Sequence, residues 1–83
     1  MRHDEILAAI EEVARLHVGF TGALRRDMRL VEDLELDSLK ALTLALEVEN
    51  RFRICIDPEL EAKIETVGDL VSAVRQLLAD HDD

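Results

Sequence analysis

The chain has 83 residues, which at roughly 150 residues per domain leaves room for one domain spanning 1–83. Nineteen acidic residues against ten basic ones give a net charge of −9, and aromatic residues make up 2% of the sequence. Nucleic-acid binding depends on basic patches and stacking aromatic side chains, and anionic membrane surfaces attract lysine and arginine. The composition therefore argues against both kinds of ligand, and an apolar content of 48% is too high for a disordered chain.

The negative charge is concentrated in the second part of the chain. Residues 1–31 hold five acidic and five basic residues, so residues 32–83 carry the whole net charge of −9. An acidic surface of this kind attracts partners with basic faces by electrostatic steering, or it only keeps the protein soluble. Charge alone does not separate these two interpretations.

Neither a targeting segment nor a disulfide is expected. Only five unbroken apolar residues, Ile6 to Ile10, follow the polar start of the chain, which is too short for a signal peptide or a membrane span. The single cysteine, Cys55, has no partner for an internal disulfide. Because it stands between two isoleucines, we expect it to be a small buried hydrophobic residue. We therefore expect a cytoplasmic, reduced protein that is monomeric.

The first part of the chain predicts one helix and a long loop. Apolar residues at helical spacing predict a helix over about residues 4–16, closed by Gly19, since glycine readily takes the left-handed cap conformation. The connection over residues 19–37 is long for so small a domain, yet it carries many large apolar side chains. We expect an ordered loop packed over the helices, with a helical turn near Leu24.

The next helix, predicted over residues 38–52 after the cap residue Asp37, has an unusually wide apolar surface. At 100° per residue its apolar side chains span about 220°, where a surface helix needs little more than about 100°. Two rows explain this width. The row expected to face the core consists of Ala41, Leu44, Ala45, Val48 and Phe52. The row expected to face outward toward a partner consists of Leu39, Leu42 and Leu46, and it ends near Glu49. The alternative is that all of these side chains are buried and Glu49 is tolerated at an edge.

Two more helices follow. Asp57-Pro58 is a helix-start signal, a cap residue followed by proline at the first position, for a short helix ending near Lys63. Thr66 is a good N-cap for the last helix, and Asp69, three residues later, completes an acidic variant of the capping box. The tail over residues 80–83 is expected to fray. Because no alternating strand pattern occurs, the predicted fold class is all-α.

Conventional catalytic and metal-binding patterns are missing from the sequence. The three histidines are scattered, and the three glycines do not form a phosphate-binding loop. Ser38 begins a helix beside Asp37, but no histidine is evident as its base, so it is not a triad nucleophile. A helix N-terminus favours an attached phosphate, whereas a lone serine in that position is usually an ordinary cap residue.

The surroundings of Ser38 carry a family resemblance. The residues that carry it are Leu34-Glu35-Leu36-Asp37-Ser38-Leu39, then Leu46-Glu47-Val48-Glu49-Asn50-Arg51-Phe52, Ile56-Asp57-Pro58 and Ile64-Glu65-Thr66-Val67-Gly68-Asp69-Leu70. Together they make the chain similar to an acyl carrier protein over nearly its whole length. The resemblance implies a four-helix bundle with a long first loop and a short third helix, and a carrier rather than an enzyme.

The resemblance also implies a cofactor and partners. Ser38 would receive 4′-phosphopantetheine from coenzyme A through a phosphopantetheinyl transferase, with Asp37 helping to present the serine and the transferase's metal ion. Acyl groups would be bound as thioesters to the terminal thiol of the arm. Acyl-, ketoacyl- or adenylate-forming synthase enzymes with basic faces would act on them. The expected partner face consists of Leu39, Lys40, Leu42, Thr43, Leu46, Glu47 and Glu49.

This chain departs from common fatty-acid carriers at two of these positions. Such carriers have acidic residues two and five positions after the serine, where this sequence has Lys40 and Thr43. We therefore expect a specialised lipid, fatty-acid or polyketide pathway. Two alternatives stay open: an aminoacyl or peptidyl carrier protein, and a non-carrier acidic adaptor whose leucine row docks a basic protein. A small hydrolase that uses Ser38 is a third and weaker one.

Overall fold

The computed structural model describes residues 2–81, which form helices joined by loops. The three long helices are α1 (His3–His17), α3 (Ser38–Phe52) and α5 (Val67–His81), and the two short ones are α2 (Leu30–Asp33) and α4 (Pro58–Lys63). No strand occurs in this range, where the only β-type pairing is an isolated bridge between Arg29 and Thr66. The all-α prediction is therefore confirmed. Of the tail expected to fray, residues 80 and 81 continue α5, and Asp82 and Asp83 lie outside the described residues.

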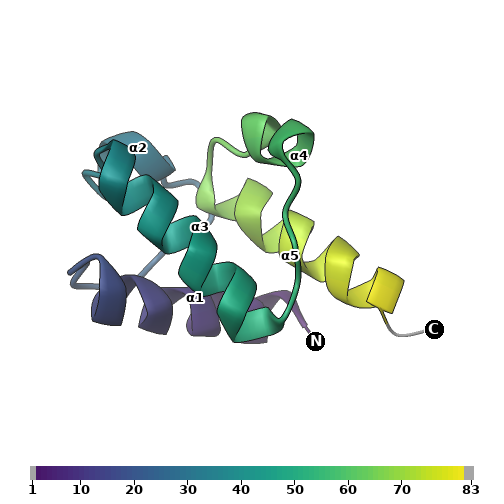
Figure 1. Ribbon diagram of the computed structural model, residues 1–83. Helices are drawn as coiled ribbons and strands as arrows, with labels where there is room; N and C mark the ends of the chain where they lie inside the picture. The colour runs from purple at the N-terminus through teal and green to yellow at the C-terminus, as the bar shows by residue number, and fades with distance from the viewer. Residues whose placement is uncertain (1, 82–83) are drawn as a thin grey trace.

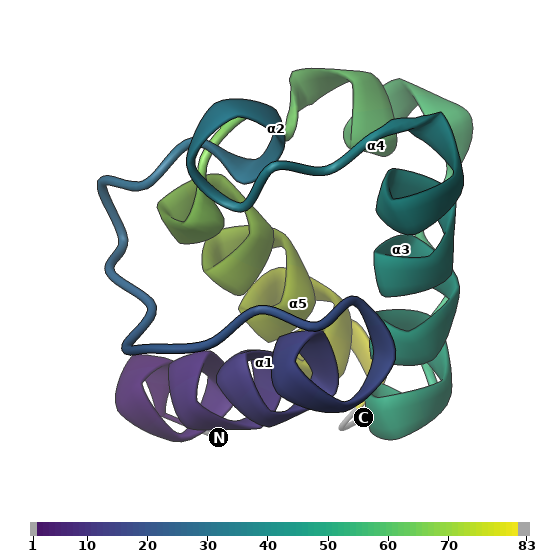
Figure 2. The ribbon, with the colours of Figure 1, turned by 90° about the vertical axis from the view of Figure 1, so that its left-hand side faces the viewer.

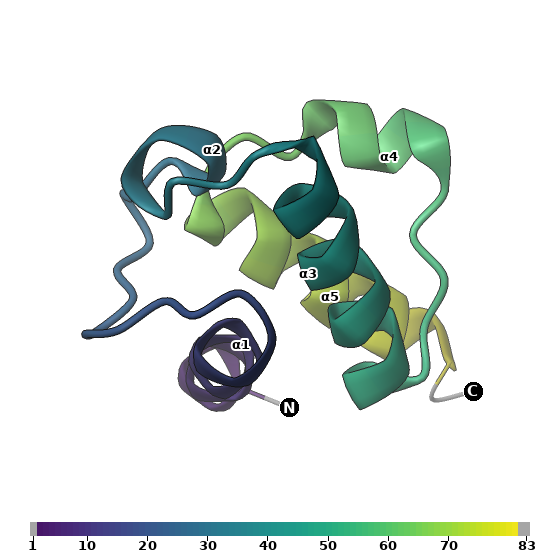
Figure 3. The same cartoon turned by 60° about the vertical axis from the view of Figure 1, so that its left-hand side comes forward.

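The three long helices enclose the core. Helix α1 packs against both α3 and α5, and Figures 1 and 3 show α3 and α5 crossing above it. The short helices α2 and α4 lie at the end of the molecule where α3 begins (Figure 2). This arrangement places both short helices near Ser38, the first residue of α3.

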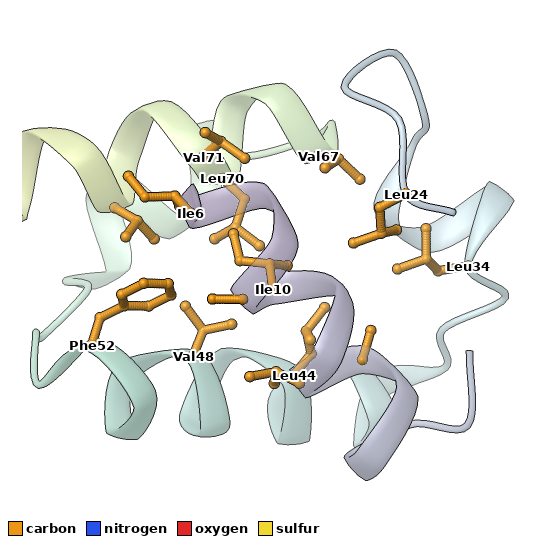
Figure 4. Close-up of a cluster of buried hydrophobic side chains, with 14 of the residues drawn as sticks. Ile6, Ile10, Leu24, Leu34, Leu44, Val48, Phe52, Val67, Leu70 and Val71 are labelled. Atoms are coloured by element: carbon orange, nitrogen blue, oxygen red, sulfur yellow. The ribbon is translucent and has the colours of Figure 1, made fainter. Parts of the chain in front are cut away.

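The core is almost wholly aliphatic. Its largest fully buried side chains are Ile6, Ile10, Val48, Val67, Val71 and Val74. Figure 4 shows Leu44, Val48 and Phe52 of α3 directed toward the side chains of α1 and α5. The predicted core row is confirmed for these three residues, while Ala41 and Ala45 are half-buried.

Side chains cap the N-termini of helices at the positions that the sequence predicts. The Asp57 carboxylate accepts a hydrogen bond from the Leu60 N–H at 2.8 Å, and Pro58 takes the first position of α4. Helix α1 ends at His17, and Gly19 follows in the left-handed conformation with φ 74°. These short-range features are confirmed because each depends on residues within one helical turn.

The capping box of α5 is formed as predicted. The Asp69 carboxylate accepts hydrogen bonds from the N–H groups of Glu65 and Thr66, both at 3.1 Å, and the Thr66 hydroxyl accepts from the Asp69 N–H at 3.1 Å. The two backbone bonds, first that from Glu65, favour the charged form and lower the pKa of Asp69 below its ordinary value of 3.8.

The Asp69 cap gives a pH-dependent prediction. Because the pKa is lower in the folded chain, this carboxylate stabilises the fold above its unfolded pKa, and the contribution is lost as the pH falls through the folded pKa. We expect Asp69→Asn to lower the free energy of unfolding by about 0.5–2 kcal/mol at neutral pH, as for a lost helix cap. The deficit relative to wild type should shrink at acid pH, below the ordinary aspartate pKa of about 3.9. Urea melts at both pH values measure it, with Glu12→Gln as an exposed control. A deficit that does not change with pH would show that charge plays no part.

The long connection between α1 and α3 is ordered, and its turn and its short helix both follow Leu24 in the chain. Leu24 is buried in irregular backbone, and its N–H donates to the Glu11 carboxylate at 2.8 Å. A hydrogen-bonded turn follows directly, in which the Met28 N–H donates to the Arg25 carbonyl at 3.1 Å, and the helix of this connection is α2, residues 30–33. In a helix the Leu24 N–H would donate to a backbone carbonyl four residues earlier, but here it donates to the Glu11 carboxylate. Local sequence patterns do not reveal this distant partner.

Backbone hydrogen bonds fasten this connection to the junction of α4 and α5. The Leu30 N–H donates to the Glu65 carbonyl at 3.0 Å, and the Val67 N–H donates to the Met28 carbonyl at 2.9 Å. Gly68 allows the close approach, because a Cβ atom there would lie 3.2 Å from the Arg26 carbonyl oxygen. These bonds therefore fix the start of α2, and the start of α3, which follows shortly in the chain, fixes its end.

The burial predicted for Cys55 is wrong, because its side chain is exposed. Its neighbours Ile54 and Ile56 are both buried. Successive side chains of an extended segment point to opposite sides, so when the two isoleucines face the core the cysteine between them faces solvent.

Candidate functional site

Ser38 lies exposed at the N-terminus of α3. Asp37 caps the helix, and its carboxylate accepts a hydrogen bond from the Lys40 N–H at 2.8 Å. This bond sets the residue at which the helix begins and leaves the Ser38 hydroxyl directed to the surface. The free N–H groups and the dipole of a helix N-terminus stabilise a phosphate there, and an exposed position avoids burying its charge. The residues present therefore fit an attached phosphodiester.

The segment that precedes Ser38 is anchored to the core by two buried leucines. Leu34 and Leu36 are each only 6% exposed, and the Leu36 N–H donates to the Val31 carbonyl at 3.1 Å. Glu35 between them has φ 54°, in the left-handed region, which costs a non-glycine residue about 1 kcal/mol or more. The segment before Ser38 is thus an anchored turn, which presents the serine from a defined position.

Among residues 2–81 the structure shows no hydrogen bond between the Ser38 hydroxyl and a histidine or carboxylate. His17 pairs with Glu47, with its Nε2 at 3.5 Å from Oε1. Glu47 lies nine residues after Ser38, which corresponds to roughly 13 Å along the helix. Within the part of the chain that the structure describes, no group of His, Cys, Asp or Glu side chains could hold a metal ion.

The outer face of α3 displays the predicted leucine row. Leu39, Leu42 and Leu46 are 72%, 54% and 50% exposed. Lys40 is exposed beside them, and the half-buried Thr43 donates its hydroxyl to the Leu39 carbonyl at 2.9 Å. The outward orientation of the row is confirmed, and the alternative that all of these leucines are buried is wrong.

The two carboxylates expected on this face, those of Glu47 and Glu49, both contact other parts of the same chain. Glu47 pairs with His17 of α1, as described above. Glu49 accepts a hydrogen bond from the Ile56 N–H at 2.8 Å and so ties the end of α3 to the segment before α4. The sequence pattern marks Glu49 as an oddity in an apolar arc, but it does not show that a loop N–H is its partner.

A cavity opens next to Ser38. Its volume is about 360 Å³, toward the lower end of the range for ligand pockets. Its apolar walls come from α2, α3, α5 and the segments before α3 and on either side of α4: Leu30, Val31, Leu36, Ala41, Leu44, Ala45, Ile56, Ile64 and Leu70. Charged side chains also line it: Arg29, Glu32, Glu61 and Glu65. Because Leu36 and Ala41 flank Ser38 in the chain, the cavity lies within reach of a group attached there.

Comparison with known proteins identifies the family. Residues 4–74 match the family described as "Phosphopantetheine attachment site". The chain belongs to this family. Its relatives include acyl carrier proteins of Arthrobacter sp. (strain FB24) and Paenarthrobacter aurescens (strain TC1), each 34% identical over 73 residues, which are 87% of this chain and 90% of the relative.

A relative with a more specific name is also similar. The "Meromycolate extension acyl carrier protein" of Mycobacterium leprae (strain TN) is 31% identical over 75 residues, which are 89% of this chain and 65% of that protein. The resemblance to acyl carrier proteins is therefore confirmed. This family member is a carrier and not an enzyme, and its cofactor is 4′-phosphopantetheine. Within residues 2–81 no helix is long and apolar enough to cross a membrane.

Proposed function

We propose that this carrier holds acyl intermediates on a phosphopantetheine arm attached to Ser38, in a specialised lipid, fatty-acid or polyketide pathway. The observation that carries the proposal is the exposed Ser38 at the capped start of α3, beside an apolar cavity. When bound, the arm supplies a terminal thiol on which acyl groups are held as thioesters. Asp37 positions the serine by fixing the first turn of the helix.

Ser38 is preferred over the other serine of the chain because of its place in a helix. Ser72 is also exposed, so accessibility alone does not exclude it. It lies within α5, however, where the backbone N–H groups are already used by the helix. Only Ser38 combines an exposed hydroxyl with a helix N-terminus.

The cavity favours an acyl cargo over the two open alternatives. An adaptor that docks proteins through the leucine row needs no internal cavity. An aminoacyl group carries a charged amine, which loses hydration free energy among aliphatic walls. An alkyl chain gains free energy there because its apolar surface leaves water.

Four further features belong to the proposal. We infer that α1, α3, α4 and α5 form the four-helix bundle expected of the family, with α2 as a turn within the long first loop. We also infer one domain over residues 1–83, a cytoplasmic location and a monomeric state. The name of the Mycobacterium leprae relative refers to meromycolate extension, which supports a specialised pathway for this chain.

Intact mass spectrometry tests the proposal. After incubation with coenzyme A and a broad-specificity phosphopantetheinyl transferase, the protein should gain the mass of one arm. Peptide mapping should place the arm on Ser38. A protein that stays unmodified with several such transferases would favour the adaptor alternative.

We propose that the outer face of α3 receives the transferase and the synthase enzymes. An enzyme that modifies Ser38 must come close to the hydroxyl, and it would then cover the exposed Leu39, Leu42 and Leu46. The acidic surface of residues 32–83 suits partners with basic faces. Lys40, Thr43, Glu47 and Glu49 complete the proposed face, but the last two carboxylates are held by His17 and Ile56. The charge on this face that lacks such a contact is Lys40, which sets this carrier apart from an acidic docking helix.

Lys40 is therefore expected to select partners. The double variant Lys40→Asp with Thr43→Glu should speed loading or elongation by general fatty-acid synthase enzymes several-fold. Exposed charge pairs contribute about 0.2–1 kcal/mol each, so the change should be graded, and salt should reduce it because the screening length is about 10 Å at 0.1 M. Kinetics at low and high salt measure the effect, with Lys63→Asp on α4 as a matched control. If the double variant is loaded and elongated at the wild-type rates at low salt, Lys40 does not select partners.

A further inference from the structure

The cavity beside Ser38 has an apolar interior and a charged rim. No buried polar or charged side chain occurs among the residues whose burial the structure gives. The charged residues that line the cavity are all exposed, so they lie at its opening: Arg29, Glu32, Glu61 and Glu65. The rim therefore carries one positive and three negative side chains.

One of these carboxylates is paired with an arginine, and the other two form no ion pair with the residues that the structure describes. The Arg29 guanidinium lies 3.5 Å from the Glu32 carboxylate. For Glu61 and Glu65 the described residues provide no ion pair, and Lys63 between them in sequence does not line the cavity. The Glu65 backbone is fixed because its carbonyl accepts the Leu30 N–H at 3.0 Å. The side of the rim formed by α4 and the segment after it is thus negative.

We propose that Glu61 and Glu65, at the rim of this cavity, make it disfavour acyl chains that end in a carboxylate relative to neutral chains of the same length. The inference rests on the proposed attachment of the arm at Ser38. On the side of α4, a chain that enters beside Leu36 and Ala41 meets Glu61 of that helix and Ile64 and Glu65 of the segment after it. A terminal carboxylate there either loses its hydration among aliphatic side chains or meets two like charges at the rim.

Two acyl groups of equal carbon number provide the test. Octanoyl and suberoyl groups differ in the carboxylate that ends the suberoyl chain. The protein is loaded with each from the corresponding coenzyme A thioester by a broad-specificity transferase, and intact mass confirms complete loading. Thermal unfolding is then compared with that of the form carrying the arm alone. We expect octanoyl to raise the melting temperature by about 4 °C or more, and suberoyl to raise it by less than half as much.

Variants of the rim make the test specific. Glu61→Gln with Glu65→Gln should bring the suberoyl shift closer to the octanoyl shift and leave the octanoyl shift unchanged. Glu59→Gln, an exposed glutamate of α4 that does not line the cavity, should leave both shifts as in wild type. Equal shifts for the two acyl groups in wild type, or no gain for suberoyl in the double variant, would overturn the inference. Failure to load either group would instead count against the proposed function, because loading is measured separately by mass.

Discussion

Replacing Ser38 by alanine is expected to abolish loading with phosphopantetheine completely, because the hydroxyl that would bond to the phosphate is removed. The fold should survive. Ser38 is exposed, and the hydrogen bond that begins α3 comes from the Asp37 carboxylate. Surface substitutions of this kind change the free energy of unfolding by about 0.5 kcal/mol or less. Intact mass measures the loading, and circular dichroism with a thermal melt confirms the fold.

The matched control is Ser72→Ala on α5. Ser72 is also exposed, so accessibility alone does not distinguish the two serines. The Ser72→Ala protein should load as fast and as completely as wild type. A second arm on wild type, or an arm retained in the Ser38→Ala protein, would show that the start of α3 is not the attachment site.

Phe52→Ala is expected to have the largest effect on stability. Phe52 is 8% exposed and belongs to the core, and Figure 4 shows its ring turned into the interior from the last turn of α3. Removing a buried phenylalanine side chain costs about 3–5 kcal/mol, since the aliphatic neighbours do not close the space completely. Native domains of this size have about 4–12 kcal/mol of stability in total. The variant should therefore be strongly destabilised, with a large part of it unfolded if wild type lies at the low end of that range.

Leu39→Ala on the same helix is the control for this measurement. Leu39 is 72% exposed, so its truncation should change the free energy of unfolding by about 0.5 kcal/mol or less. Urea melts of both variants report the difference. A cost below about 1 kcal/mol for Phe52→Ala would mean that the ring contributes little to the core, contrary to its burial.

Local patterns were sufficient to predict most of the helices. Asp37, Asp57 and the Thr66–Asp69 pair mark helix starts by hydrogen bonds to backbone N–H groups at most four residues away. The apolar arc of the helix after Ser38 predicted both its buried row and its exposed leucines, since the rotation of 100° per residue is a property of the helix itself. The exposed serine at a helix start followed from the same reasoning.

Features that depend on distant residues could not be read in this way. Leu24 is bonded to Glu11 and Ile56 to Glu49, and α2 is fastened through Leu30 to Glu65. The first two bonds join a loop N–H to a helix carboxylate, and the third joins the start of α2 to the segment between α4 and α5, so each partner is defined only once the helices have packed. For this reason the backbone at Leu24 is irregular, and the turn expected near it begins only at Arg25. The exposure of Cys55 likewise depends on which side of its segment faces the core.

The sequence by itself determined the three long helices and α4, their caps, the exposed Ser38 and the resemblance to acyl carrier proteins, because these depend on neighbouring residues and on helical periodicity. Only the tertiary structure decided that a cavity lies beside Ser38 and that Glu61 and Glu65 border it. The residues that line that cavity come from α2, α3, α4, α5 and the segments next to them, which are brought together by burial of the apolar core. Its volume and the charge of its rim are therefore consequences of how the helices pack, and no single segment encodes them.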